Sequence, residues 1–276
     1  MKKINILWFK KDLRILDNEA LIEAQKDADI LPLYIVEKEL WKQKAYSDRQ
    51  WQFCKECLIE LRMELESLGQ PLVIRVGDAL EIFEEISKSF QINGVYSHQE
   101  TGDYFSYKRD QNILIWLREK NIKWHQFLQF GVFRGTINRN DWSILYKKQL
   151  NRMVFDKPLK INPIEIKLGE LPNDSFFNFE KDLCKGRLKG GRKNALKRIN
   201  YFFNHKINSY KNDISNPDKS FVTPVRIFGS FGGRRSLHGS NIEFALRIFQ
   251  PQPRPTQMEN RKHGHSLLSF KGTPRF

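Results

Sequence analysis

The sequence has few cysteines and no long apolar run, and these absences exclude several classes of protein. Three cysteines do not make the disulfide framework of a small secreted protein. Cys54 and Cys57 form a C-x-x-C pair on one predicted helix face, and no second pair completes a zinc site. No apolar run approaches membrane-spanning length, and Met1–Phe9 lacks the apolar region and cleavage site of a signal peptide. We therefore expect a cytoplasmic protein without membrane contact.

Motifs of several common enzyme classes are missing as well. No G-x-G-x-x-G follows the first predicted strand, which counts against an ordinary NAD-dependent dehydrogenase. The segment Gly186–Lys193 superficially resembles a phosphate loop. Because it lacks the G-K-[ST] ending and a preceding strand, we interpret it as the entry to a helix. The six histidines are scattered and indicate no metal site. The sequence also gives no indication of a Ser/His/Asp catalytic triad.

What the chain does have is a large excess of positive charge. Its 47 Lys and Arg outnumber 32 Asp and Glu, so the formal net charge is +15 over 276 residues. This excess favours a polyanionic partner, most simply nucleic acid, although a solubilising surface charge explains it without any partner. Aromatic residues make up 13% of the chain. They stack on flat cofactors or bases in some proteins and simply fill cores in most.

Short apolar runs alternate with helical patterns through the first half of the chain. The runs are rich in Ile, Val and aromatic residues, as buried parallel strands are. Because repeated β-α-β units connect by right-handed crossovers, the alternation predicts an α/β fold with a doubly wound, five-stranded parallel sheet. The predicted strands are Ile4–Phe9, Ile30–Val36, Leu72–Val76, Gly94–Ser97 and Ile122–Phe127, and the predicted helices are Asn18–Gln25, Asp48–Ser67, Ala79–Phe90 and Tyr104–Glu119.

Composition divides the chain into four parts. Residues 1–130 hold the α/β pattern, and residues 131–189, with scattered prolines and aromatics, are interpreted as an interdomain connector with short helices. Residues 190–220 begin a helical segment whose apolar positions run to about Tyr210. Residues 221–276 have nine Lys or Arg against two acidic residues and no sustained period. That composition predicts a disordered basic tail.

Two charged loops mark the candidate ligand site. In a doubly wound sheet, ligands bind beyond the carboxyl ends of the strands, at the switch point. If the first and fourth strands are neighbours, the loops that follow them bound a common crevice for a flat or anionic ligand. A surface ion-pair network accounts for the same residues without a ligand, so both interpretations stay open. The residues concerned are Lys10, Lys11, Asp12 and Arg14 in the first loop and His98, Gln99 and Glu100 in the second.

Several motifs carry a resemblance to one family. Leu7–Arg14 has the sequence L-W-F-K-K-D-L-R, and Asp17–Leu21 has D-N-E-A-L. Together they resemble the opening signature of photolyases and cryptochromes. Further similarities follow in order and extend, through Gly190-Gly191 and the next helix, over most of the chain. They are L-P-L-Y-I at Leu31–Ile35, Gly77-Asp78, H-Q-E-T-G at His98–Gly102 with Arg109-Asp110 downstream, and N-R-N-D-W at Asn138–Trp142.

The resemblance implies an α/β domain that can hold an antenna chromophore, a connector, and an all-helical domain that binds FAD. In photolyases, which are lyases, light excites reduced FAD, and an electron passed to a pyrimidine dimer in DNA splits the dimer. Cryptochromes use the same scaffold for blue-light sensing. The resemblance puts the first strand between the second and fourth and makes the crevice the antenna-side pocket, for a flavin, a deazaflavin, a folate or nothing. It assigns Tyr210 to the FAD phosphates and implies a monomeric protein that binds dimer-containing DNA.

The resemblance weakens beyond residue 220. The family's T-S-R-L-S-P-type segment, which binds the FAD phosphates, is replaced by Phe221–Phe231, and the later flavin-domain helices have no counterpart. We therefore expect a truncated or frameshifted product that neither holds FAD in the family's manner nor repairs DNA alone. A native basic tail that contacts DNA is the rival interpretation. A stand-alone nucleotide- or chromophore-binding module is the third alternative to repair and sensing.

Overall fold

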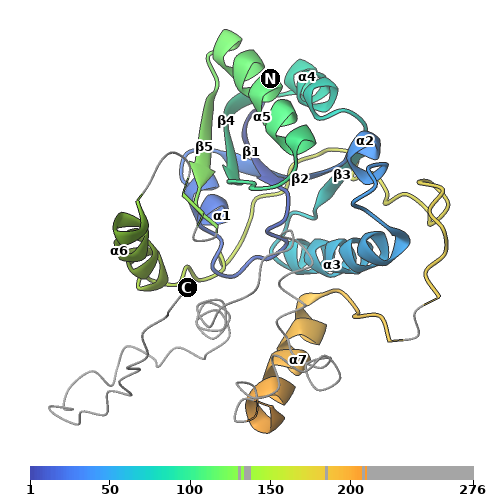
Figure 1. Cartoon of the computed structure of the whole chain (residues 1–276). Coiled ribbons are helices and arrows are strands. Elements are labelled where there is room, and N and C mark those ends of the chain that lie inside the picture. Colours follow the sequence, from blue (N-terminus) through green and yellow to red (C-terminus); the bar gives the residue numbers. More distant parts are fainter. Residues whose placement is uncertain (130–131, 134–137, 184–185, 207–208, 210–276) are drawn as a thin grey trace, which may run out of the picture.

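Five parallel strands form one sheet in the order β3-β2-β1-β4-β5 (Figure 1). The computed structural model describes residues 1–129, 132–133, 138–183, 186–206 and 209. The predicted five-stranded parallel sheet, with β1 between β2 and β4, is confirmed. The strands are β1 (Lys3–Phe9), β2 (Asp29–Val36), β3 (Val73–Val76), β4 (Gln91–His98) and β5 (Lys123–Phe127).

Helices cover both faces of the sheet, and two hydrophobic clusters fill the layers between. Alternate residues of β1 point to opposite faces. Leu7 and Phe9 join the cluster built with α1 and α3, and Trp8 joins the cluster built with α4 and α5. Both faces are therefore buried, as a parallel sheet requires. The helices are α1 (Glu19–Ala24), α2 (Lys38–Trp41), α3 (Asp48–Ser67), α4 (Ala79–Ser89), α5 (Tyr104–Glu119), α6 (Arg139–Leu150) and α7 (Arg192–His205).

Most predicted helix limits agree with the structure, and the differences have local causes. Helices α3 and α5 have the predicted bounds. The side chain of Asp78 accepts hydrogen bonds from the amides of Leu80 and Glu81, so it caps α4. Helix α2 is a single turn and is too short to give a period. On α3, Cys54 is buried in the core and Cys57 is partly buried.

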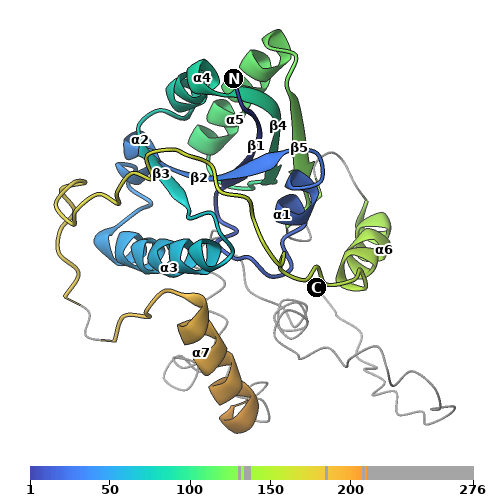
Figure 2. The same cartoon turned by 180° about the vertical axis from the view of Figure 1, so that it is seen from behind.

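The connector lies against the α/β layers and covers the outer edge of β3 (Figure 2). The amide of Ile161 donates to the carbonyl of Leu68, and the amide of Ile74 in β3 donates to the carbonyl of Leu168, each at 2.7 Å. The buried side chain of Gln70 accepts a hydrogen bond from the amide of Ile164. These contacts give the backbone groups at the strand edge partners within the chain.

Replacing Gly169 by alanine is expected to release the connector from β3. Gly169 has φ +73°, and an added Cβ would lie 2.1 Å from the carbonyl oxygen of Ile74. We expect the free energy of unfolding to fall by more than about 1 kcal/mol, measured by urea denaturation. Gly186→Ala is the matched control, because no heavy atom lies within 4 Å of its added Cβ. Equal stabilities of the two variants would contradict the prediction.

The predicted FAD contact and the predicted disordered tail concern residues outside the described ranges. Tyr210 and residues 221–276 lie outside the described residues, so the FAD contact and the disordered tail stay predictions. The four domain limits also stay predictions. No helix within the described ranges is long and apolar enough to cross a membrane, and the cytoplasmic location stays a prediction too.

Candidate functional site

The loops after β1 and β4 meet at the switch point of the sheet. Strands β2 and β3 lie on one side of β1, and β4 and β5 lie on the other. The order in which strands are added therefore changes direction between β1 and β4. Open α/β sheets bind ligands beyond the carboxyl ends of the strands at this position. The structure therefore brings together the loops that the sequence singled out, Lys10–Arg14 and His98–Gly102.

Side chains from the two loops pair with each other. Asp12 and His98 are both buried, and Oδ2 of Asp12 lies 2.6 Å from Nδ1 of His98. Lys11 Nζ lies 3.1 Å from Glu100 Oε1. The buried Lys10 makes its ion pair with Asp110 of α5, at 2.9 Å. The ion-pair interpretation therefore describes how these residues are held, and their role in ligand binding stays a prediction.

The remaining two predicted residues bind backbone groups. Arg14 donates from Nη2 to the carbonyl of Asp17 at 3.0 Å. The amide of Gln99 donates to the carbonyl of Phe127 at 2.7 Å, which ties the end of β4 to the end of β5. Their contacts fix the shape of the loops.

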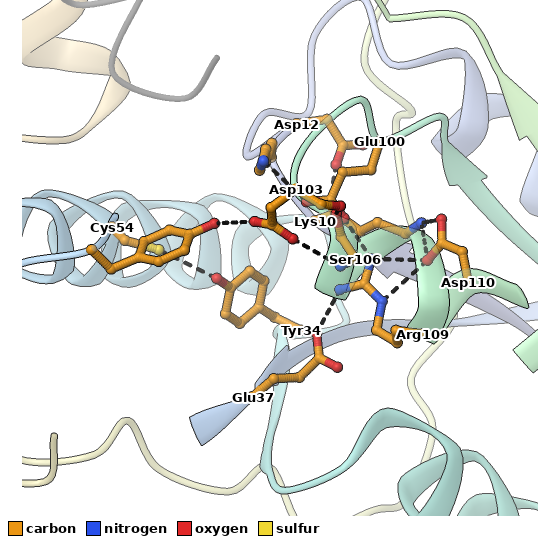
Figure 3. Close-up of polar contacts among 12 residues, drawn as sticks. Lys10, Asp12, Tyr34, Glu37, Cys54, Glu100, Asp103, Ser106, Arg109 and Asp110 are labelled. Atoms are coloured by element: carbon orange, nitrogen blue, oxygen red, sulfur yellow. Dashed lines mark hydrogen bonds and ion pairs between the residues drawn. The ribbon is translucent and has the colours of Figure 1, made fainter. Parts of the chain in front are cut away.

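Arg109 is the centre of this network, and Figure 3 shows the carboxylates that surround it. Its guanidinium donates to Glu37 and Glu100 at 2.5 Å each and to Asp110 at 2.8 Å. It also lies 4.8 Å from the ring centroid of Trp8. Charge-assisted bonds of this kind hold side chains in fixed positions. The arginine thus joins the ends of β2 and β4 to helix α5.

The network shifts the acidity of its members in opposite directions. Burial would raise the pKa of Glu100, but the charges of Arg109, Lys10 and Lys11 lower it to about 2. Burial likewise opposes ionisation of Asp12, and the interaction with His98 lowers its pKa to about 2. Burial lowers the pKa of Lys10, against the attraction of Asp110.

Glu37 differs from these carboxyls. Burial raises its pKa to about 7, although the charge of Arg109 and their hydrogen bond oppose the shift. Its Oε2 accepts the bond from Arg109, and its buried Oε1 has no hydrogen-bond partner within the described part of the chain. A carboxyl with one unsatisfied oxygen away from water holds a proton more readily than an exposed one.

Stability is therefore expected to depend on pH through Glu37. Its pKa is about 7 in the folded chain against an ordinary value of 4.5, so the folded state binds the proton more tightly. The free energy of unfolding then falls as pH rises from 4.5 through about 7, by on the order of 1–3 kcal/mol. Glu37→Gln should flatten this slope in urea unfolding across that range. Glu39→Gln, at an exposed neighbour on α2, is the control and should keep it.

A groove of about 370 Å³ lies beside the network. It runs between the start of α5 and strand β5, and its volume is within the range of small-molecule sites. Of the seven predicted site residues, only Glu100 lines it. Trp124 gives it an aromatic wall, and Ser106, Gln111 and Gln126 add polar groups. The full lining is Glu100, Thr101, Gly102, Asp103, Ser106, Tyr107, Asp110, Gln111, Leu114, Trp124 and Gln126.

Lys10 connects the groove to the buried network. Its ammonium lies 4.3 Å from the ring centroid of Trp8 and 5.0 Å from that of Trp124. Nε1 of Trp124 donates to the hydroxyl of Ser97 at 3.0 Å, which holds the indole in place. A flat ligand in the groove would therefore meet an aromatic ring that already contacts a cation.

Sequence reasoning missed most of the groove. In the sequence, Arg109 and Asp110 form a motif without an assigned role, and no pattern marks Glu37 or Trp124. The available sequence signal for Glu37 was its position, because a charged residue directly after a buried strand lies at the edge of the sheet where ligands bind. Within the described ranges no group of three or more His, Cys, Asp or Glu is placed to hold a metal ion.

Comparison with known proteins supplies the family. Residues 5–141 match the family model described as DNA photolyase. The chain is 37% identical over 107 residues to a chloroplastic/mitochondrial cryptochrome DASH of Arabidopsis thaliana, which is 36% of this chain and 19% of the relative. It is similar in structure to a cryptochrome of Synechocystis sp. PCC6803, with a TM-score of 0.63 and 20% identity over 76% of this chain and 48% of that one.

A second solved structure extends the comparison. It is an archaeal photolyase from Sulfolobus tokodaii with two FAD molecules, which the chain resembles with a TM-score of 0.56 and 21% identity over 71% of this chain and 45% of that one. The chain therefore spans less than half the length of each of these three relatives. The family match over residues 5–141, the predicted signature motifs and the parallel sheet together show that the chain belongs to the photolyase/cryptochrome family.

Proposed function

We propose that the whole protein is a light-driven flavoprotein that repairs pyrimidine dimers in DNA by electron transfer from reduced FAD. Family membership supports the reaction, and the two FAD molecules of the archaeal relative support FAD as the cofactor. The net charge of +15 suits a DNA partner. In this proposal the helical part that begins with α7 binds FAD, with Tyr210 at its phosphates, and the protein acts as a monomer in the cytoplasm.

For the α/β domain we propose chromophore binding, and the groove beside Trp124 is the observation that carries it. The indole offers a surface on which a flat ring stacks. Ser106, Gln111 and Gln126 offer hydrogen bonds to polar edges of such a ring. The chromophore would be a flavin, a deazaflavin or a folate, and when bound it would absorb light and pass the excitation to the flavin. The predicted loop residues Lys10, Lys11, Asp12, Arg14, His98, Gln99 and Glu100 then support the groove.

Trp124→Ala is expected to weaken chromophore binding about tenfold or more, because stacking on one aromatic ring contributes roughly 1–3 kcal/mol. The measurement is a fluorescence titration of the purified chain with riboflavin, FMN, FAD and a reduced folate. Trp142→Ala on α6 is the matched control, because Trp142 does not line the groove. If Trp124→Ala binds the preferred chromophore as tightly as Trp142→Ala does, the groove assignment is wrong.

Blue-light sensing is the second candidate function, favoured by the 37% identity to a cryptochrome DASH. Light-dependent loss of pyrimidine dimers from damaged DNA separates the two. Repair by the whole protein supports the first proposal, and its absence in a protein that binds FAD supports sensing. For the 276-residue chain alone we expect no repair, because a site that encloses FAD needs more helices than α7. Chromophore binding without any photochemistry in the whole protein would support a stand-alone module.

A further inference from the structure

The first turn of helix α7 lacks the capping and acidic residues that stabilise the start of a helix. Its N-cap is Gly191, with φ +96° and no side-chain hydrogen bond to the first turn. The first turn has no acidic residue and begins with Arg192 and Lys193. Positive side chains are unfavourable at the positive end of the helix dipole. Since an isolated helix of 14 residues is marginal in water, its support has to come from another element.

Helix α3 provides the missing cap. Glu56 Oε2 accepts a hydrogen bond from the amide of Gly190 at 2.5 Å, and Glu60 Oε1 accepts one from the amide of Lys193 at 2.9 Å. Between them, Sγ of Cys57 accepts from the amide of Gly191 at 3.1 Å. Three amide groups at the start of α7, which no turn of α7 itself can satisfy, thus find acceptors on α3.

Charge complementarity extends the contact. Glu56, Glu60 and Glu64 are four residues apart and form one stripe on α3, on a different face from the core residues. Glu56 also pairs with both Nη atoms of Arg187, at 2.7 and 3.1 Å. Burial would raise the pKa of Glu56, but bonds from Arg187 and Gly190 lower it. Burial raises the pKa of Glu64, and the charges of Arg192 and Lys193 oppose this shift.

The backbone of the Gly-Gly pair touches α3 so closely that side chains would not fit. A Cβ on Gly190 would lie 2.2 Å from the carbonyl oxygen of Phe53 and 3.0 Å from Sγ of Cys57. A Cβ on Gly191 would lie 2.1 Å from Oε2 of Glu60. The side chain of Asn194 closes the turn by donating to the carbonyl of Gly190 at 2.7 Å.

We propose that the acidic stripe of α3, Glu56, Glu60 and Glu64, is the docking site that nucleates α7 and fixes the direction in which the helical part leaves the α/β domain. The stripe acts as an intramolecular ligand for Gly190–Lys193. The amides of Gly190, Gly191 and Lys193, in the segment that resembles a phosphate loop, are therefore occupied by α3 and do not bind phosphate. This proposal is independent of the chromophore and of FAD.

The test compares Glu56→Ala/Glu60→Ala with Glu84→Ala/Glu85→Ala in the full 276-residue chain. The control pair removes two exposed carboxylates from α4, so the charge change is the same. Hydrogen exchange is followed at the amides of Gly190, Gly191 and Lys193 and along α7. We expect exchange there to be about tenfold faster or more in the α3 variant, because each lost cap weakens a helix appreciably, and exchange in β1 to be unchanged.

A second readout uses the thiol between the two glutamates. Undocking of α7 uncovers Cys57, so its alkylation rate should rise while that of Cys54, which is 1% exposed in the core, should not. Gly190→Ala should reproduce the faster exchange in α7 and the faster alkylation of Cys57 without a change of charge. If the double variant fails to fold, Gly190→Ala alone tests the proposal. Exchange in α7 that matches the α4 control in both variants would overturn the proposal.

Discussion

Replacing Arg109 by glutamine is expected to lower the free energy of unfolding by about 3–5 kcal/mol, because it leaves Glu37, Glu100 and Asp110 buried without their common cation. Lys10 and Lys11 still neutralise part of this charge. Without the cation, Glu37 keeps its proton to higher pH. The loss of stability should grow as pH rises, because the remaining buried carboxyls then ionise. Urea denaturation at neutral pH measures the effect.

Arg118→Gln is the matched control for this substitution. Arg118 lies on the same helix, α5, near its carboxyl end, and is exposed. Its loss should change stability by no more than about 0.5 kcal/mol. Arg109→Lys keeps the charge but cannot reach three carboxylates at once, so an intermediate value is expected. A stability loss for Arg109→Gln no larger than that for Arg118→Gln would show that the network contributes little to folding.

Trp51→Ala is expected to cost a comparable amount, about 3–5 kcal/mol, through a cavity in the core. Trp51 is fully buried on α3 and contacts Trp41 edge-on with ring centroids 5.1 Å apart. It also contacts Phe177 of the connector at 4.8 Å. The substitution therefore removes an aromatic contact between the α/β layers and the connector as well as core volume.

The control and the specific readout follow from that second contact. Trp142→Ala removes the same side chain from the surface of α6, where Trp142 is 40% exposed, and should cost about 1 kcal/mol or less. In Trp51→Ala, hydrogen exchange around Phe177 should rise together with exchange in α3. If the connector stays protected while α3 loosens, the connector does not depend on the aromatic contact.

The sheet was predictable because its signal is local. Residues Ile4–Phe9 are apolar over the whole run, and such a run bounded by charged loops indicates a buried strand wherever it occurs. The bounds of α3 and α5 followed from their helical period in the same way. Strand β4 was predicted too short, because Gln91 and Asn93 interrupt its apolar run. The backbone nevertheless pairs with β1 from Gln91 onward, with a register shift that passes over Asn93.

The site was predictable only in part, since its key partners are distant in sequence. The loops next to β1 and β4 could be placed at one crevice from topology alone. That Arg109 would meet Glu37 could not be inferred, because the register of α5 against the strands decides it. The D-N motif at Asp17-Asn18 shows the same limit. Asn18 caps α1, and Asp17 accepts bonds from the amide of Phe155 and the side chain of Arg152, so both residues hold structure.

The bond from Ile74 to Leu168 has a consequence for synthesis of the protein. Strand β3 leaves the ribosome long before the connector segment that covers its edge, so the edge has no partner in the growing chain. Such edges pair with other chains, and pairings distant in sequence form slowly. A nascent chain that ends before residue 161 would therefore expose β3, and its need for chaperones should end once the segment up to Gly169 has emerged.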